Sequence, residues 1–310
     1  MQNYYPYRKN LLDKNTLSRL YTLQPIKVII PTLFSWLIIV ICWFYVARNT
    51  ESLLIIFFAI LIIQTQVYSL LIIAHDGLHR RLFYSTKNND IWNDFFILGS
   101  IGIITEINRT NHMNHHKCLS TLDDPDRFKY IFTGRSNESE FIKSIFCVGL
   151  ISTAIKNVLY NKQTHGKIKS YKLRDIFILC TWQILLITLL TLYIRWWAYP
   201  LLWLVPCAIA VCFDLVRVFC EHSEFQENDS ISDSGMRLHS FESNFLERIF
   251  FSPHNMNCHI AHHLWPAIPF YNLRKAEKIL KKELKNNDFV TWRKGYLDHL
   301  GKYYLWIKKV

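Results

Sequence analysis

Four long apolar segments constrain the fold of this chain more than any other feature. They span residues 27–47, 52–74, 175–194 and 199–220. An α-helix rises about 1.5 Å per residue, so roughly 20 residues cross the ~30 Å hydrocarbon core of a bilayer. The sequence therefore predicts an all-α integral membrane protein with four transmembrane helices. We expect residues 1–310 to form a single domain.

The short connections between these segments predict two helical hairpins. Residues 48–51 and 195–198 each contain a single basic residue, whereas nearly all other Lys and Arg lie near the N-terminus, in 75–174 and in 221–310. By the positive-inside rule these basic regions face the cytoplasm, where we expect them to form a cap that includes both termini. The basic residues behind the net charge of +12 thus flank the apolar segments. This position indicates contact with anionic lipid rather than binding of nucleic acid.

Four further segments have weaker patterns. Residues 91–107 and 141–160 are apolar but short or interrupted by charge, and we expect interfacial or half-inserted helices there. Residues 223–240 are polar and aperiodic, which predicts a loop. Residues 274–287 have a basic helical pattern, typical of a solvated or lipid-surface helix; a docking surface for a partner is the alternative.

Most of the 13 histidines fall into three clusters. The first has the spacing H-x-x-x-H and the other two have H-x-x-H-H, formed by His75 and His79, by His112, His115 and His116, and by His259, His262 and His263. Residues three and four apart share one helix face, so each cluster can direct two or three imidazoles at one point. Metal ions bind imidazole nitrogen at about 2.1 Å. Eight imidazoles exceed the needs of one four-coordinate ion, and two metals are the expected number.

The predicted topology places all three clusters on one membrane side. The first follows the end of the second apolar segment, and His222, a ninth candidate ligand, follows the end of the fourth. His165, His239, His254 and His299 have no such cluster and are interpreted as ordinary polar residues, although His254 could support the third cluster.

The three clusters and their order resemble the membrane fatty acid desaturase family, which also contains hydroxylases and carotenoid ketolases. The matching text is HDGLHRRLF (75–83), NRTNHMNHHKCLSTLDDPD (108–126), RVFCEH (217–222) and HNMNCHIAHHLWPAIPFYNL (254–273). All eight cluster positions carry histidine, and His222 matches the place where the family supplies a further ligand. The resemblance runs from about residue 75 to 273 and includes the preceding hairpin.

Imidazole suits Zn, Cu, Fe and Ni, so ligand type alone does not select the metal. The resemblance implies two iron ions as cofactors and O₂ as co-substrate. Under that interpretation the reduced centre removes hydrogen from two adjacent methylenes of a lipid acyl chain. Such C–H bonds carry no acidic proton, so a strong metal-based oxidant is required.

Carboxylates near the clusters are candidates for orienting the histidines. Ligating imidazoles usually donate their second N–H to a carboxylate or carbonyl. The candidates are Asp76, Glu106, Asp123, Asp124, Asp126 and Glu221. Asn257 matches a family position that helps to complete the metal environment. Asp214 and Arg217, near the end of the fourth segment, form an ion pair beside the site or lie at headgroup level.

Electrons must come from a partner protein. The sequence contains no His-Pro-Gly-Gly haem element, no cysteine pattern for an iron–sulfur cluster and no Gly-rich dinucleotide fingerprint. We expect an external donor, either a ferredoxin or a similar small haem or flavin protein. The other expected partner is the membrane lipid or acyl substrate.

Two alternatives to desaturation remain at this stage. A hydroxylase or ketolase could use the same scaffold, because the choice depends on substrate placement. A metal transporter or structural zinc protein is more remote, since a transport site is expected near the bilayer midplane on interrupted helices.

Overall fold

The computed structural model describes Arg8 and residues 11–130, 141–142, 171–223, 238–284 and 290–308. It is mostly helical, which confirms the predicted fold class. The chain divides into two compact units. The apolar unit comprises Leu23–Asn108 and Lys169–Val211, and the histidine unit comprises Met1–Thr22, Arg109–Ile168 and Cys212–Val310. The expectation of a single domain stays a prediction.

Four helices in the described residues are long and apolar enough to cross a membrane. They are α3 (Ile26–Arg48), α4 (Leu53–Leu78), α10 (Leu173–Tyr193) and Pro200–His222, the last built from η3 (Pro200–Leu204) and α11 (Val205–His222). Their apolar windows have a mean hydropathy of 2.1 to 2.2. The four predicted spans are confirmed as helices of this kind.

Two of the predicted helix ends are wrong by a few residues. α4 continues to Leu78, so His75 lies on its last turn. The sequence had suggested that His75 follows the end of the segment. The helix stops only where Arg80 adopts φ 59°, a left-handed conformation that an α-helix does not tolerate. α11 similarly extends through His222. The apolar pattern ends before the helices do, because polar residues such as histidine can occupy the last turn of a helix.

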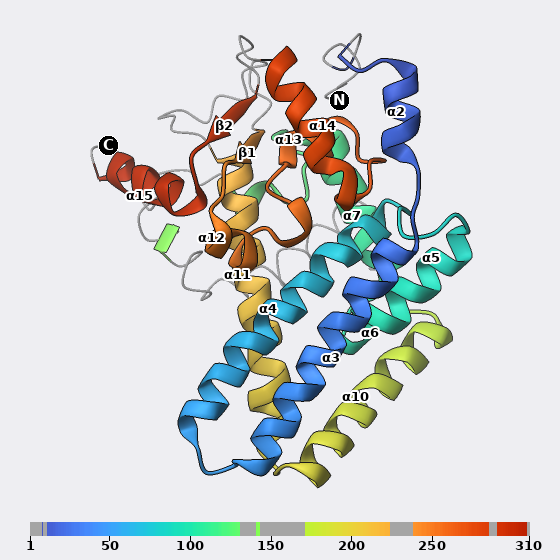
Figure 1. The fold of residues 1–310 in the computed structure, drawn as a ribbon, viewed down its shortest axis with the longest axis vertical. Helices are drawn as coiled ribbons and strands as arrows, with labels where there is room; N and C mark the ends of the chain where they lie inside the picture. Colours follow the sequence, from blue (N-terminus) through green and yellow to red (C-terminus); the bar gives the residue numbers. More distant parts are fainter. Residues whose placement is uncertain are drawn as a thin grey trace. The chain divides into compact units, whose positions relative to one another are not determined.

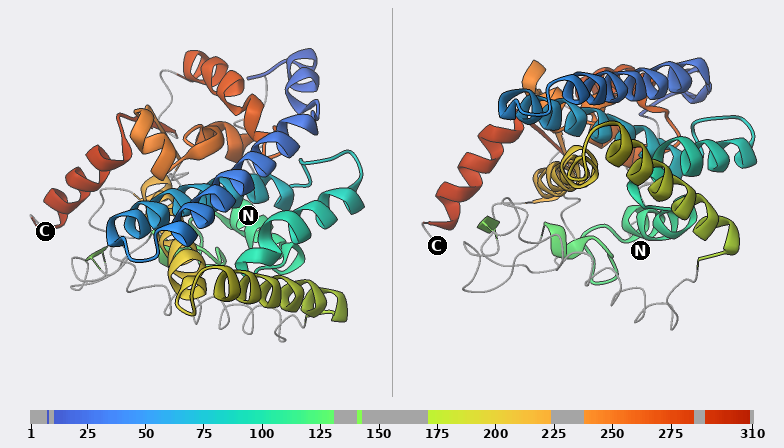
Figure 2. Two further views of the ribbon diagram at one scale, coloured as in Figure 1. Left: turned by 60° about the horizontal axis from the view of Figure 1, so that its bottom comes forward. Right: turned by 90° about the horizontal axis from the view of Figure 1, so that it is seen from below.

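Large apolar side chains cover the outside of α3, α4 and α10. They include Ile30, Leu33, Phe34, Leu37, Phe57, Phe58, Phe177, Ile184 and Leu192, each more than half exposed. In water such a surface would be costly, whereas in a bilayer it contacts lipid at no penalty. α3 and α4 lie side by side along their length (Figures 1 and 2). These features fit a membrane protein; the two hairpins and the cytoplasmic cap stay predictions.

The segment predicted as one helix over 91–107 is broken. It forms α5 (Thr86–Trp92), the π-helix η1 (Asn93–Leu98) and the short α6 (Gly99–Ile101), and α7 (Thr105–Cys118) begins after a break. Gly102 at the break has φ 88°, which L-residues rarely adopt.

Tryptophans satisfy the carbonyls that this irregular segment leaves open. The indole N–H groups of Trp36, Trp182 and Trp203 donate to the carbonyls of Phe96, Phe95 and Ser100 at 2.8, 2.6 and 3.0 Å. Unpaired carbonyls are costly in an apolar environment. Trp36 also stacks on Trp182 and on Trp203, so the same rings hold the segment against α3 and α10.

The histidine unit is built from short helices and one small sheet. Its elements are α2 (Lys14–Tyr21), most of α7, η2 (Arg127–Lys129), the end of α11, β1 (His239–Phe241), α12 (Phe245–Phe250), η4 (Pro253–Asn255), α13 (His259–Leu264), α14 (Phe270–Glu283), β2 (Thr291–Arg293) and α15 (Tyr296–Ile307). β1 and β2 pair in parallel, with His239 opposite Thr291 (Figure 1). A parallel pair needs a long crossover, which α12 to α14 provide.

Three weaker predictions can be compared with this unit. The loop predicted over 223–240 is wrong at its end, where His239 and Ser240 belong to β1; residues 224–237 lie outside the described part. The segment 141–160 also lies outside it, except for Phe141 and Ile142. The basic helix is α14, which starts earlier than expected, at Phe270, because the apolar residues Phe270 and Leu273 pack on its buried side.

Candidate metal centre

Two short helices of the histidine unit carry the second and third histidine clusters. α7 bears His112, His115 and His116, and α13 bears His259 and the pair His262 and His263. The spacing of three and four residues brings the rings of each cluster to one side of its helix. The side chains of the third cluster are almost fully buried. The predicted clustering on helices is therefore observed.

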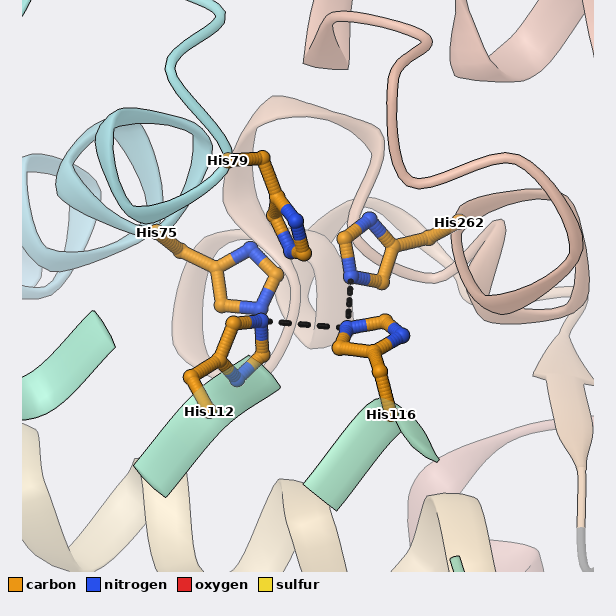
Figure 3. Close-up of side chains that lie close together, drawn as sticks. All are labelled: His75, His79, His112, His116 and His262. Atoms are coloured by element: carbon orange, nitrogen blue, oxygen red, sulfur yellow. Dashed lines mark hydrogen bonds between the residues drawn. The ribbon is translucent and has the colours of Figure 1, made fainter. Parts of the chain in front are cut away.

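The first histidine group of this unit joins α7 to α13. The Nε2 atoms of His112 and His262 lie 3.1 and 3.0 Å from Nε2 of His116. Figure 3 shows these rings directed at one another. Three donor atoms from two helices thus converge on one point.

His75 and His79 lie in the apolar unit at the end of α4. His75 is on the last helical turn and His79 is the C-cap residue. Their ring centroids are 5.4 Å apart, which makes them a pair on the same side of the helix end (Figure 3). The two histidines of the first predicted cluster therefore lie close together in the apolar unit.

A second group in the histidine unit combines three elements. The ligand nitrogens of His115, His222 and His263, from α7, α11 and α13, all lie within 4.8 Å of one another. His259 extends the group, because its Nε2 lies 3.1 Å from Nε2 of His222. All four side chains are buried.

The two groups are neighbours within this unit. The rings of His116 and His263 stack with centroids 4.2 Å apart, so one member of each group touches the other. The two groups therefore form one continuous set of imidazoles that could hold metal.

The nitrogen separations fit metal coordination. Two nitrogens bound at about 2.1 Å are roughly 3.0 Å apart at a 90° angle and roughly 3.4 Å apart at the tetrahedral angle. The observed 3.0 and 3.1 Å correspond to the 90° case.

Burial prepares the imidazoles to act as ligands. It lowers the pKa of His112, His116, His259 and His263 well below the usual value, and neighbouring histidines lower it further. The neutral form therefore dominates, and metal ions bind neutral imidazole. The histidine groups can hold metal ions.

Asp124 orients His115 in the second group. Its carboxylate accepts from Nδ1 of His115, with Oδ1 3.0 Å and Oδ2 3.2 Å away, which leaves Nε2 to face the other histidines. Burial alone would lower the pKa of His115, but the charge of Asp124, its hydrogen bond and the charge of Asp126 together outweigh burial, and the pKa is raised. Asp124 also accepts backbone N–H groups of Ser120 and Asp126.

Glu221 has the corresponding position beside His259. Its Oε2 lies 3.2 Å from Nδ1 of His259, on the ring edge opposite His222. The same carboxylate forms an ion pair with Arg217, which also pairs with Asp214 at 2.8 Å. The sequence left the pairing of Asp214 and Arg217 open; both belong to this network.

Four other predicted supporting residues have different contacts. Glu106 forms an exposed ion pair with Lys172 at 2.7 Å in the apolar unit. Asp126 pairs with Lys129 at 2.6 Å. Asn257 donates to the carbonyl of Phe241 at 2.8 Å, and so fixes β1 to the start of the third cluster. Asp76 is buried on the last turn of α4, next to His75.

The remaining candidates lie apart from the histidine groups or outside the described residues. Asp123 follows the second cluster in an exposed turn. The ring of His254 packs 4.9 Å from that of Phe270, and burial lowers its pKa to about 4. His165 lies outside the described residues. His239 and His299 are buried and bind the backbone carbonyl and the hydroxyl of Ser223, respectively, both at 2.8 Å.

Two tyrosines were not predicted from the sequence. The hydroxyl of Tyr130 donates to Asp124, and that of Tyr296 donates to Glu221 at 3.0 Å. The Tyr130 ring also lies 5.1 Å from the His222 ring. Burial and the Asp124 charge raise the pKa of Tyr130, which keeps its hydroxyl protonated as a donor. Neither tyrosine belongs to a motif, so no local signal marks it.

Glu277 of α14 was also missed. It is buried, and it accepts from the N–H of Ala261 at 3.0 Å and from the indole of Trp292 at 2.7 Å. A signal existed in the sequence, because Glu277 occupies the apolar face of α14 with Leu273 and Leu280. A carboxylate on such a face indicates a specific partner.

Comparison with protein families finds one match. Residues 50–295 match the fatty acid desaturase family. No match is found among the curated proteins or among the solved structures. The matched range covers most of the chain and contains all three histidine clusters.

Proposed function

Since the chain belongs to the fatty acid desaturase family, we propose that it catalyses O₂-dependent desaturation of a lipid acyl chain at a histidine-bound di-iron centre. The family membership makes the protein an oxidoreductase. The observation that carries the finer proposal is the pair of adjacent histidine groups, in which ring nitrogens lie 3.0 to 3.1 Å apart.

Nine histidines would hold the two ions. We assign His112, His116 and His262 to one ion and His115, His222, His259 and His263 to the other. His75 and His79 would complete the first set. Their assignment is supported by the family match and by their intact pairing at the end of α4. When bound, two irons supply the oxidising chemistry, in which O₂, two electrons and two protons convert –CH₂–CH₂– into –CH=CH– and two waters.

The chain itself supplies orientation. Asp124 accepts the Nδ1 proton of His115, so this ring would present Nε2 to the metal, and the Glu221 carboxylate lies 3.2 Å from Nδ1 of His259. Their hydrogen bonds to Tyr130 and Tyr296 hold the carboxylates in place. These six residues fix ligand geometry and do not themselves touch the acyl chain.

Iron is favoured over zinc on two grounds. Zinc is redox-inert and prefers four ligands in a tetrahedron, whereas nine histidines are available here. An unactivated methylene has no proton that a protein base could remove. Redox-active ions are therefore the better fit to a desaturase.

The apolar unit would place the enzyme in the membrane, where its acyl substrate lies. Its exposed helices fit a bilayer, where a lipid acyl chain already lies. We propose that the termini and the histidines face the cytoplasm, as the positive-inside rule predicts. A small external electron carrier would then reach the centre from that side.

Expression in a heterologous host with defined fatty acids tests this proposal. Gas chromatography and mass spectrometry of total fatty acids should reveal a new unsaturated species with the wild type and none with His115→Ala. His254→Asn serves as the matched control, because this histidine contacts Phe270 and its φ of 55° is tolerated by Asn. The control should retain the product.

Two results would refute the proposal. A hydroxylated or ketonic product in place of the alkene would identify a different oxidation on the same scaffold. An unsaturated product that persists in His115→Ala, at normal protein levels, would separate the activity from the histidines.

A further inference from the structure

One face of α14 concentrates positive charge on the surface of the histidine unit. Arg274, Lys275, Lys278, Lys281 and Lys282 are exposed along this helix, and Glu283 is its exposed acid. Lys281 forms an ion pair with Glu242. We call the five cationic residues the basic face. It is long enough to meet a complementary patch on another molecule.

The opposite face of α14 is unavailable to lipid. Leu273, Ala276 and Leu280 are fully buried, and Phe270 is nearly so. A helix that lies in the membrane interface inserts its apolar side between lipids. Because that side is already packed within the unit, α14 cannot insert it between lipids, and the exposed side carries the charged residues.

α14 lies directly against the helix that carries the third histidine cluster. The two helices pack side by side (Figure 1). On the buried side of α14, Glu277 accepts the N–H of Ala261, which lies between His259 and His262 in α13. The connection from α14 to the histidine-bearing backbone is thus one hydrogen bond of 3.0 Å.

We propose that the basic face of α14 is the docking surface for a small acidic electron-transfer protein. This inference rests on the proposed function, which consumes two electrons for each double bond. The carrier is oxidised and O₂ is reduced. The chain has no haem, iron–sulfur or dinucleotide motif of its own, so the electrons arrive from outside.

Charge complementarity identifies the partner class. Opposite potentials steer two proteins together and set their orientation, and the effect weakens with salt. The basic face offers mainly charge, which suits a transient complex. A carrier bound there would lie over α14, on the outside of the third cluster.

Binding to the intact protein provides the test. The full chain is placed in nanodiscs of phosphatidylcholine, which carry no net charge, and titrated with a recombinant acidic [2Fe–2S] ferredoxin. The variant Lys275→Glu/Lys278→Glu/Lys282→Glu should raise the Kd at least about tenfold. Raising ionic strength from about 0.02 to 0.2 M should weaken the wild type much more than the variant.

A charge-matched variant controls for net charge. Lys294→Glu/Lys302→Glu/Lys308→Glu changes three exposed lysines of the same unit outside α14. It should bind ferredoxin as the wild type does. Turnover driven by dithionite, which needs no docking, should be unchanged in both variants.

The outcomes separate this inference from the proposed function. Unchanged ferredoxin binding in the α14 variant would place the docking surface elsewhere. The titration is repeated in nanodiscs that contain anionic lipid, and an effect of the α14 variant seen only there would assign the face to headgroups and overturn the inference. Ferredoxin binding that depends on α14, but without any desaturated product, would contradict the proposed function alone.

Discussion

Two networks in the histidine unit each connect a histidine, a carboxylate and a tyrosine, but different groups stabilise the two carboxylates. In one, the chain of contacts is His115, Asp124 and Tyr130; in the other, it is His259, Glu221 and Tyr296. Each carboxylate holds a histidine and accepts a tyrosine hydroxyl. The elements that supply them are unrelated, since Asp124 follows α7 in a turn and Glu221 lies in α11.

The difference lies in how each buried charge is balanced. Asp124 accepts backbone N–H groups from Ser120 and Asp126. Glu221 instead pairs with Arg217, whose side chain is 4% exposed. The Asp124 carboxylate is stabilised by backbone N–H groups of its own turn. The Glu221 carboxylate instead compensates the charge of a buried guanidinium, so its loss would also destabilise Arg217. The first network should therefore matter most for the metal, and the second also for stability.

The largest expected effect is on stability in the second network. Glu221→Gln removes a carboxylate that pairs with the buried Arg217 guanidinium, and we expect a loss of about 3 kcal/mol in the free energy of unfolding. Asp124→Asn should cost clearly less. Thermal unfolding of the purified protein in detergent measures both.

The double variant Arg217→Met/Glu221→Gln is its control. Removing both charges should restore part of the loss, because no buried cation remains. Equal losses for Glu221→Gln and Asp124→Asn would contradict the contrast between the networks.

Metal affinity should show the next largest effect, now in the first network. Asp124→Asn removes the charge that orients His115, and we expect metal affinity to fall about 10- to 100-fold. Competition with a chelator, followed by metal analysis of the protein, measures the change. Glu106→Gln, an exposed carboxylate in the other unit, should have no effect. An affinity unchanged in Asp124→Asn would show that His115 needs no such partner.

The two tyrosines should differ more modestly. Tyr130→Phe leaves a fully buried carboxylate with one donor fewer, beside the His222 ring, and should lower metal affinity about tenfold. Tyr296→Phe removes a donor from a carboxylate that still has Arg217, and should mainly lower stability, by about 1 kcal/mol. The same competition and unfolding measurements distinguish them. Identical behaviour of the two variants would show that Arg217 makes no difference.

Glu277 offers a third buried carboxylate, and the smallest expected effect. Burial raises its pKa, so the folded protein keeps a proton that the unfolded chain has lost above its ordinary value of 4.5. Stability is therefore lost as pH rises from that value through the folded pKa. Glu277→Gln has no such proton, and its unfolding temperature should depend less on pH over this range. An unaltered pH dependence would show that the raised pKa does not affect stability.

Periodicity and hydropathy were enough to predict the main features of this fold. The apolar lengths predicted four spans, and the spacing of His112, His115 and His116 predicted one helical face. Both patterns involve residues close together in the sequence, so they can be recognised without knowledge of the tertiary fold. The helix end at Leu78 was missed because the apolar run stops at Ala74 although the backbone can continue.

The partners of the histidines were only partly predictable. Asp124 follows the second cluster closely in sequence and Glu221 precedes His222 directly, so proximity to a candidate ligand was a sufficient guide. Tyr296 reaches Glu221 from 75 residues away, through the packing of α15. Proximity also misled, since Glu106 pairs with Lys172 and Asn257 with a backbone carbonyl. Contacts that depend on tertiary packing leave no pattern in one sequence.

Metal analysis of the purified protein tests most directly that the two histidine groups each hold an iron. Protein from iron-replete, anaerobically handled cells should contain two irons per chain by inductively coupled plasma mass spectrometry. His222→Ala/His263→Ala, which disrupts only the second group, should reduce this to about one. Zinc in place of iron, or no more than one metal ion in the wild type, would contradict the di-iron centre.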